Sequence, residues 1–443
     1  MFSNKDLRKL IIPLVIEQLL AVTIGMADTV MVSSCGEAAV SGISLVDSIN
    51  FLLITLFSSL ATGGAVIASQ YIGRGDHKSA SLAAKQLFYA SLALSAVLGV
   101  IAVFFRKPVL NMVFGSIEAD VMAHAQIYFL LSAISYPFLA VYNAGAALLR
   151  SMGDSRTTML ISILMNTINI VGNAILIYGF QMAAAGAATA SLVSRAVGAI
   201  IITVLLLNPR RIIFYDKLHK PEIHLSMLKS ILQIGVPNGL ENSIFQIGKI
   251  LVASIVSGFG TISITANAVA GNLASLQVIP GMALGMAMIT VVGQCIGAKD
   301  YEAVKKYTKK LMLITYGVVW AMTLLMLLFS KQILSFYSLS EETTTMTMEV
   351  FIVHGICAVI VWPLAFALPN ALRAANDVRF TMIVSLLSMW IFRIGFSYIL
   401  AIHFNMGILG TWIAMCIDWF CRGACFVIRF ARGKWKNISF IDN

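Results

Sequence analysis

The chain has 443 residues, of which 59% are hydrophobic and only 12% are charged. Because a soluble domain is about 25% charged, this composition excludes an ordinary water-soluble protein and indicates a membrane protein. The formal net charge is +11. We attribute this charge to membrane topology and not to nucleic-acid binding, since the basic residues gather on one side of the predicted helices.

About 20 consecutive apolar residues span a bilayer as a helix. The sequence predicts an all-α polytopic membrane protein with twelve transmembrane helices, at 9–33, 43–71, 86–105, 126–148, 158–180, 183–207, 231–256, 262–295, 308–330, 348–370, 378–403 and 407–428. With both termini inside, 25 of the 31 Lys and Arg residues, among them Arg150, Arg373 and Arg422, fall on cytoplasmic segments. This positive-inside pattern predicts a multi-pass protein of the plasma (inner) membrane with two cytoplasmic termini.

The sequence repeats itself at half length. IPLVIEQ (12–18) matches VPNGLEN (236–242), and SQYIGRGD (69–76) matches GQCIGAKD (293–300), both at an offset of 224. LLRSMGDSR (148–156) matches ALRAANDVR (371–379) at an offset of 223. Because six helices are duplicated, the two halves have the same orientation, an architecture typical of alternating-access transporters. We predict two pseudo-symmetric six-helix lobes (1–207 and 231–430), a cytoplasmic linker (208–230) and a cytoplasmic tail (431–443).

Polar residues of three predicted helices fall at one depth. Asp28 precedes the outer end of the first helix, Asn173 precedes the outer end of the fifth, and Thr189 follows the outer start of the sixth. At about 1.5 Å rise per residue, all three lie about 9–11 Å below the outer boundary. Asn166, Asn169 and Asn173 share one helical face, and Asn166 is a candidate for a proton path or a substrate contact. Carboxylate, amide and hydroxyl groups suit Na⁺ or a proton, and a purely structural hydrogen-bond network is the alternative.

Other charged residues inside the predicted helices have two interpretations each. Glu17, on the face of Asp28, either extends a proton path or serves the structure. Its repeat partner Glu241 either contacts substrate or a coupling ion, or forms an ion pair with Lys249 or across the lobes. Asp47 lies near the outer start of the second helix, as a structural residue or at a cavity mouth. Arg393 and Asp418 lie at one depth, which predicts a structural ion pair.

Several motifs together resemble the multidrug and toxic compound extrusion (MATE) family of bacterial transporters. They are Gly-x-x-Asp-Thr-x-Met (25–31), Gln-x-Ile-Gly-x-x-Asp (70–76 and 294–300), Leu-Arg-x-x-Gly-Asp-x-Arg (149–156) and AAAGAATASLVSR (183–195). The resemblance implies two six-helix lobes and cation-driven efflux of amphipathic, usually cationic, compounds. It also implies a cation site at Asp28, Asn169, Asn173 and Thr189. Family members commonly carry a second Asp where this chain has Asn173, so both H⁺ and Na⁺ stay open as coupling ions.

The remaining sequence features favour a transporter over an enzyme. The six histidines are scattered, and no P-loop, Rossmann or Gly-x-Ser-x-Gly pattern lies in a fitting context. We therefore expect no cofactor beyond the coupling ion, a small organic molecule as substrate, membrane lipid as surroundings, no nucleic acid, and a monomer.

A lipid-linked oligosaccharide flippase is the alternative function. Its long anionic substrate favours a basic cavity. Five acids are expected inside the membrane against three basic residues, and this slightly acidic balance favours organic cations. The acids are Glu17, Asp28, Asp47, Glu241 and Asp418, and the basic residues are Arg195, Lys249 and Arg393.

Overall fold

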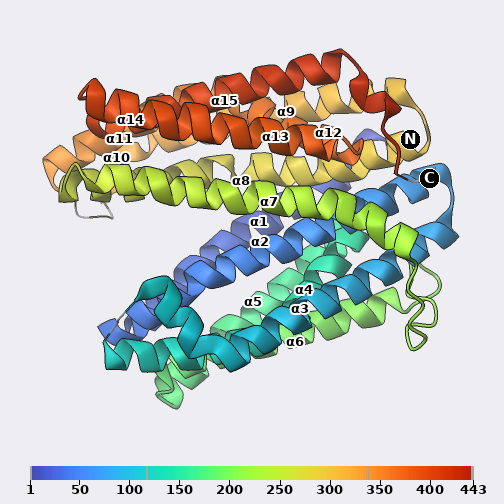
Figure 1. Cartoon of the computed structure of the whole chain (residues 1–443), viewed down its shortest axis with the longest axis horizontal. Helices are drawn as coiled ribbons and strands as arrows, with labels where there is room; N and C mark the ends of the chain where they lie inside the picture. Colours follow the sequence, from blue (N-terminus) through green and yellow to red (C-terminus); the bar gives the residue numbers. More distant parts are fainter. Residues whose placement is uncertain (1, 116–117, 336, 338, 441–443) are drawn as a thin grey trace. The chain divides into compact units, whose positions relative to one another are not determined.

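The computed structural model describes residues 2–115, 118–335, 337 and 339–440, without the side chains of residues 24 and 26–29. It consists of two compact units, Met1–Gly239 and Leu240–Asn443, and the boundary falls within helix α7 (Leu225–Ser257). Figure 1 shows that helices make up both units. The all-α fold class predicted from hydropathy is therefore confirmed.

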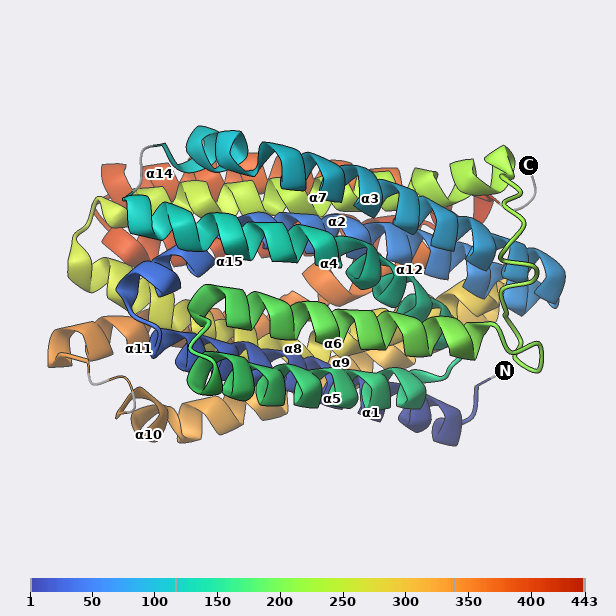
Figure 2. The same cartoon turned by 90° about the horizontal axis from the view of Figure 1, so that it is seen from below.

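The N-terminal unit is organised around its fourth helix. Its elements are α1 (Asn4–Ser33), α2 (Glu37–Arg74), α3 (His77–Phe114), α4 (Ala119–Ser151), α5 (Ser155–Asn173), the π-helical segment η1 (Ala174–Gly179) and α6 (Ala183–Leu206). α4 packs against α2, α3 and α6, and α5 packs against both α1 and α6. α5 and α6 lie side by side in Figure 2. The asparagine-bearing helix α5 thus meets the two helices that carry Asp28 and Thr189.

The C-terminal unit continues from α7 with further elements, most of which are shorter after α9. They are α8 (Thr261–Gly297), α9 (Tyr301–Leu328), α10 (Ser330–Ser335), α11 (Glu341–Ile360), η2 (Pro363–Ala367), α12 (Leu368–Ala374), α13 (Val378–Ser388), η3 (Met389–Gly395), α14 (Phe396–Tyr398), η4 (Ile399–His403), α15 (Gly407–Ala431) and the 3-10 turn η5 (Lys434–Asn437). α15 packs along α13 and η3 (Figure 1). Segments η2, η3 and η4 are π-helical, a departure from α geometry that is frequent at functional sites.

The repeated aspartates of the motifs begin helices. The Asp76 carboxylate accepts the backbone N–H of Ser79 at 3.0 Å at the start of α3, and the Asp300 carboxylate accepts that of Ala303 at 2.9 Å at the start of α9. Such an N-cap satisfies a donor that the helix leaves free and contributes about 1 kcal/mol. The last position of this repeated motif therefore has a structural role in both halves.

Eleven helices of the described part of the chain are long and apolar enough to cross a membrane. The 30-residue helix α1 adds the twelfth predicted span. Most helices run several residues beyond the predicted apolar stretches, as α4 does at both ends. The linker between α6 and α7, residues 207–224, forms turns and no interfacial helix.

Candidate functional site

Two buried asparagines of α5 face α6. The Asn169 Nδ2 donates to Ser191 Oγ on α6 at 3.0 Å, and the Asn173 Nδ2 approaches Asn169 Oδ1 at 3.5 Å. Asn169 is 6% exposed and Asn173 is 1% exposed. Two adjacent amides away from water supply carbonyl oxygens, which are ligands for Na⁺ or acceptors for a protonated carboxyl group.

Thr189 and Asn166 border this pair. The Thr189 hydroxyl is half-buried and donates to the Ala185 carbonyl at 2.7 Å, so its oxygen lone pairs stay available for a cation. Asn166, one turn before Asn169, donates to Ser162 Oγ at 3.3 Å. Sequence reasoning missed Ser191 as a partner, although it lies two residues after Thr189 in the AAAGAATASLVSR stretch.

Asp28 belongs to α1, but its side chain lies outside the described residues. The backbone of α1 is helical through this position, and α1 packs against α5. The structure therefore fixes which helices surround the site, and the reach of the Asp28 carboxylate stays a prediction.

Glu17, eleven residues earlier on α1, forms an ion pair with a basic residue. Arg150 Nη1 of α4 donates to Glu17 Oε1 at 3.3 Å, and Thr158 Oγ1 of α5 donates to Oε2 at 2.9 Å. Glu17 is 7% exposed. Since each carboxylate oxygen has a donor, this geometry favours a structural role for Glu17.

Glu241 repeats this arrangement in the C-terminal unit. Arg373 Nη2 and Ser385 Oγ both donate to Glu241 Oε1 at 2.7 Å. Glu241 thus pairs with Arg373, and not with Lys249 as one sequence alternative had it. Its Oε2 atom is buried without a hydrogen-bond donor among the described residues.

Asp47 takes part in a polar network of the N-terminal unit. Its Oδ1 accepts hydrogen bonds from Tyr128 at 3.0 Å and from Asn50 at 3.2 Å. Asn50 is buried and accepts the Tyr136 hydroxyl at 2.7 Å. Arg195, for which the sequence indicated no partner, donates to Ser135 Oγ at 2.7 Å. The tyrosine contacts connect α2 to α4, and the Arg195 contact connects α6 to α4.

Arg393 and Asp418 lie together in the C-terminal unit, with Nη1 and Oδ2 3.8 Å apart. A closer partner, Arg422 on the same helix as Asp418, donates to Oδ2 at 2.8 Å. The Ser388 hydroxyl donates to the other carboxylate oxygen. Asp418 is fully buried and Arg422 is 2% exposed.

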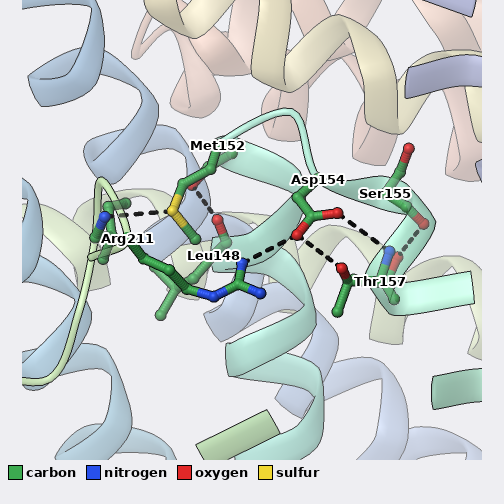
Figure 3. Close-up of polar contacts among 9 residues, drawn as sticks. Leu148, Met152, Asp154, Ser155, Thr157 and Arg211 are labelled. Carbon is green, nitrogen blue, oxygen red and sulfur yellow. Dashed lines mark hydrogen bonds and ion pairs between the residues drawn. The ribbon is translucent and has the colours of Figure 1, made fainter. Parts of the chain in front are cut away.

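The loop after α4 anchors the linker between α6 and α7 (Figure 3). Asp154 begins α5 and accepts hydrogen bonds from Thr157 and, at 3.0 Å, from Arg211 of the linker. Burial alone would raise the pKa of Asp154, but the hydrogen bonds from Thr157 and Arg211 outweigh it and lower that pKa below its usual value. The Gly-Asp motif is therefore a helix cap and a linker contact.

The half-length repeat coincides with a known family. The MatE family model matches residues 13–175 and again residues 237–399, so that the two matches are offset by 224 positions. Together they cover well over half of the sequence. The chain belongs to the MatE family.

Relatives of this MatE transporter match it nearly end to end. An uncharacterized transporter, YisQ of Bacillus subtilis, is 27% identical over 96% of this chain and 93% of its own length. A probable multidrug resistance protein NorM of Thermotoga maritima is 26% identical over 98% and 93%. The outward-facing structure of a multidrug resistance MATE family transporter shares its fold, with a TM-score of 0.89, 20% identity, and coverage of 98% and 97%. The predicted twelve-helix, two-lobe fold and the non-enzymatic role are confirmed.

The charge balance inside the helices of this MatE transporter differs from the prediction. Arg150, Arg373 and Arg422 were assigned to cytoplasmic segments, yet their side chains are 18%, 11% and 3% exposed and pair with acids within the helical units. With these three added, basic residues inside the helices outnumber the five acids. Once these arginines are counted, the balance of five acids against three basic residues no longer holds; Arg150 and Arg373 lie just beyond the predicted spans, whereas Arg422 lies within the span 407–428.

Proposed function

We propose that this MatE transporter is an antiporter that exports amphipathic organic compounds from the cytoplasm and imports H⁺ or Na⁺ in exchange. The observation that carries the proposal is the buried Asn169–Asn173 pair on the α5 face, close to α6 and on a helix that packs against α1. The names of the relatives, a transporter and a multidrug resistance protein, support the substrate class.

The proposed coupling site combines one acid with neutral oxygens. Asp28 binds the ion, and Asn169, Asn173 and Thr189 complete its ligands or hydrogen-bond partners. A single carboxylate neutralises one monovalent cation, and the amide oxygens replace the water that the ion loses. Glu17 has its own partners and in this proposal holds α1 against α4 and α5.

Coupling follows from different affinities in the two states of the transporter. Ion binding at Asp28 favours the state with low affinity for substrate, and substrate binding favours release of the ion. Linkage makes this relation reciprocal, since each ligand must lower the affinity for the other by the same factor. In this proposal the transporter works as a monomer.

One observation supports the alternative function, a lipid-linked oligosaccharide flippase. The three arginines added to the interior remove the acidic balance that spoke against a long anionic substrate. The full-length match to a multidrug resistance protein favours drug efflux. Transport of a small aromatic compound separates the two functions.

The test is ethidium export from proteoliposomes that contain the full chain. Wild-type protein should export ethidium under a proton gradient alone or a Na⁺ gradient alone, and the gradient that works identifies the coupling ion. Asp28→Asn should abolish gradient-driven export while it preserves ethidium binding. Asn166→Ala, which removes a half-buried amide outside the proposed ligand set, is the matched control and should transport normally.

Three results would contradict the proposal. Transport by Asp28→Asn at the wild-type rate would make the α1, α5 and α6 residues a structural network. Equal loss in the Asn166→Ala control would mean that the amide network as a whole is structural. Absence of ethidium export with either gradient would contradict the substrate class, and flipping of a lipid-linked oligosaccharide by the same liposomes would then establish the alternative.

A further inference from the structure

Three cationic side chains surround one aromatic ring in the C-terminal unit. Lys249 Nζ, Arg393 Cζ and Arg422 Cζ each lie 5.3 Å from the centroid of the Phe245 ring. Arg422 also lies 4.9 Å from the centroid of Phe366. We refer to these five residues as the cation cluster. Aromatic faces attract cations, but they carry no net charge.

The positive charge of the cluster exceeds the negative charge that pairs with it. Among the described residues, Asp418 is the acid that pairs with both Arg393 and Arg422. Its Oδ2 atom lies 3.8 Å from Arg393 Nη1 and 2.8 Å from Arg422 Nη2. Both guanidinium groups stay protonated under all ordinary conditions. One carboxylate therefore leaves an excess of positive charge before Lys249 is counted. Charges inside membrane helices are costly unless a partner neutralises them, and they mark ligand sites.

Three donors at the cluster have no acceptor in the part of the chain that the structure describes. Nε of Arg393, Nε of Arg422 and Nε1 of Trp419 are buried with no acceptor among the described residues. Arg393 is 9%, Arg422 2% and Trp419 4% exposed. Buried polar groups are nearly always hydrogen-bonded, so three orphan donors at one place call for an acceptor. An anionic group supplies both the acceptor atoms and the missing charge.

Aromatic rings adjoin the same donors. Phe366 stacks on Trp362 with ring centroids 5.3 Å apart, and it meets Trp419 edge-on at 5.4 Å and Phe245 at 6.2 Å. Flat ring surfaces beside cationic groups fit a planar aromatic molecule with an acidic substituent. Lys249 is exposed whereas Asp418 is fully buried. The cluster therefore has an accessible cation in Lys249, whereas its acid is buried together with the arginines.

We propose that the cation cluster binds the carboxylate of aromatic substrates, so that the C-terminal unit accepts aromatic acids and zwitterions. The substrate class then extends beyond the organic cations that the sequence predicts. The inference deepens the proposed function, since it takes the chain as an exporter of aromatic compounds. The opposing explanation is a structural cluster that Asp418 and the aromatic faces already stabilise.

Two probes with the same ring system and opposite charge distinguish these explanations. The purified full chain in neutral detergent is dialysed against 1-naphthoate or against 1-naphthylmethylammonium, and bound probe is measured. The site should bind 1-naphthoate about tenfold more tightly, as expected when charge-assisted hydrogen bonds replace a repulsive contact. Equal affinities for the two probes, or tighter binding of the ammonium, would overturn the proposal.

Lys249→Gln tests the place of binding without disturbing a buried pair. It should weaken 1-naphthoate binding about fivefold or more by removing one charge-assisted contact, and it should leave ammonium binding unchanged. Lys331→Gln, an exposed lysine on α10, is the matched control and should bind like wild type. Arg393→Gln should weaken 1-naphthoate further, with the thermal unfolding midpoint measured in parallel. Unchanged 1-naphthoate binding in Lys249→Gln would place the site elsewhere and contradict the inference.

Failure of this inference differs from failure of the proposed function. If Lys249→Gln binds 1-naphthoate like wild type while ethidium export still depends on Asp28, the antiporter stands and the cation cluster is structural. If 1-naphthoate binds as expected but no gradient drives ethidium export, the cluster is a binding site and the proposed antiport is wrong.

Discussion

Glu241 accepts a hydrogen bond from Arg373 at 2.7 Å, and these two residues occupy the positions that Glu17 and Arg150 hold in the other half of the sequence. Each glutamate follows a proline by four residues, and each arginine precedes a repeated aspartate by four. The hydroxyl partners differ by one turn of helix. Thr158 donates in the first half, whereas Ser385, the equivalent of Ser162, donates in the second. An ion pair to a buried glutamate thus connects the proline-containing helix of each half of the sequence, α1 or α7, to its neighbours.

Glu17→Gln should destabilise the N-terminal unit. The change leaves the half-buried Arg150 without its acid, which costs about 3 kcal/mol and lowers the thermal unfolding midpoint by about 5–10 °C. The double variant Glu17→Gln with Arg150→Gln should recover part of this loss, because no charge is then left unpaired. Thermal unfolding of the purified chain in detergent measures both effects.

The exposed Glu302–Lys305 pair of α9 is the control for that measurement. Glu302→Gln should leave the midpoint unchanged, since exposed pairs contribute little. An equal shift of the midpoint in Glu302→Gln and Glu17→Gln would show that burial does not determine how much the Glu17–Arg150 pair contributes to stability.

Asp154→Ala should loosen the linker between α6 and α7. The variant loses the N-cap of α5 and the contact with Arg211, so trypsin should cut after the exposed Lys217 faster than in wild type. Asp76→Ala, which removes the cap of α3, is the matched control and should leave the cleavage rate unchanged. Similar acceleration in both variants would attribute the effect to general destabilisation.

Asn173→Asp should raise the affinity for Na⁺. A second carboxylate beside Asn169 offers a charged ligand in place of an amide, and we expect about a tenfold lower Na⁺ concentration for half-maximal effect. The Na⁺ dependence of the unfolding midpoint and of ethidium export measures this change. Asn166→Asp adds the same charge one turn below Asn169 and should have a smaller effect. Identical Na⁺ curves for wild type and Asn173→Asp would place the cation site away from α5.

Hydropathy and the internal repeat predicted the fold well. The two arms of the repeat also correspond to the two stretches that the family model matches. Helix ends were less predictable, since α4 continues to Ser151 although its apolar run stops near residue 148. A helix keeps its backbone hydrogen bonds beyond the hydrocarbon region, so its polar ends give no hydropathy signal.

The candidate site was predictable in part. The depth argument placed Asn173 and Thr189 at one level of the membrane, and the structure shows that their helices, α5 and α6, are in contact. The partners of Glu17 and Glu241 were missed because Arg150 and Arg373 lie at those unrecognised helix ends. Arg422 was missed for a different reason. It pairs with Asp418 one turn earlier on the same helix, but its charge alone does not show whether it forms this pair or lies at the cytoplasmic side.

The most direct test of coupling at Asp28 runs the transporter backward. Proteoliposomes with an ethidium gradient and no ion gradient are monitored for internal pH and for uptake of radioactive Na⁺. The account predicts that wild-type protein moves one of these ions against the ethidium flow, that Asn166→Ala does the same, and that Asp28→Asn moves neither ion. Ion movement by Asp28→Asn at the wild-type rate, or ethidium flow without counter-movement of either ion in wild type, would contradict it.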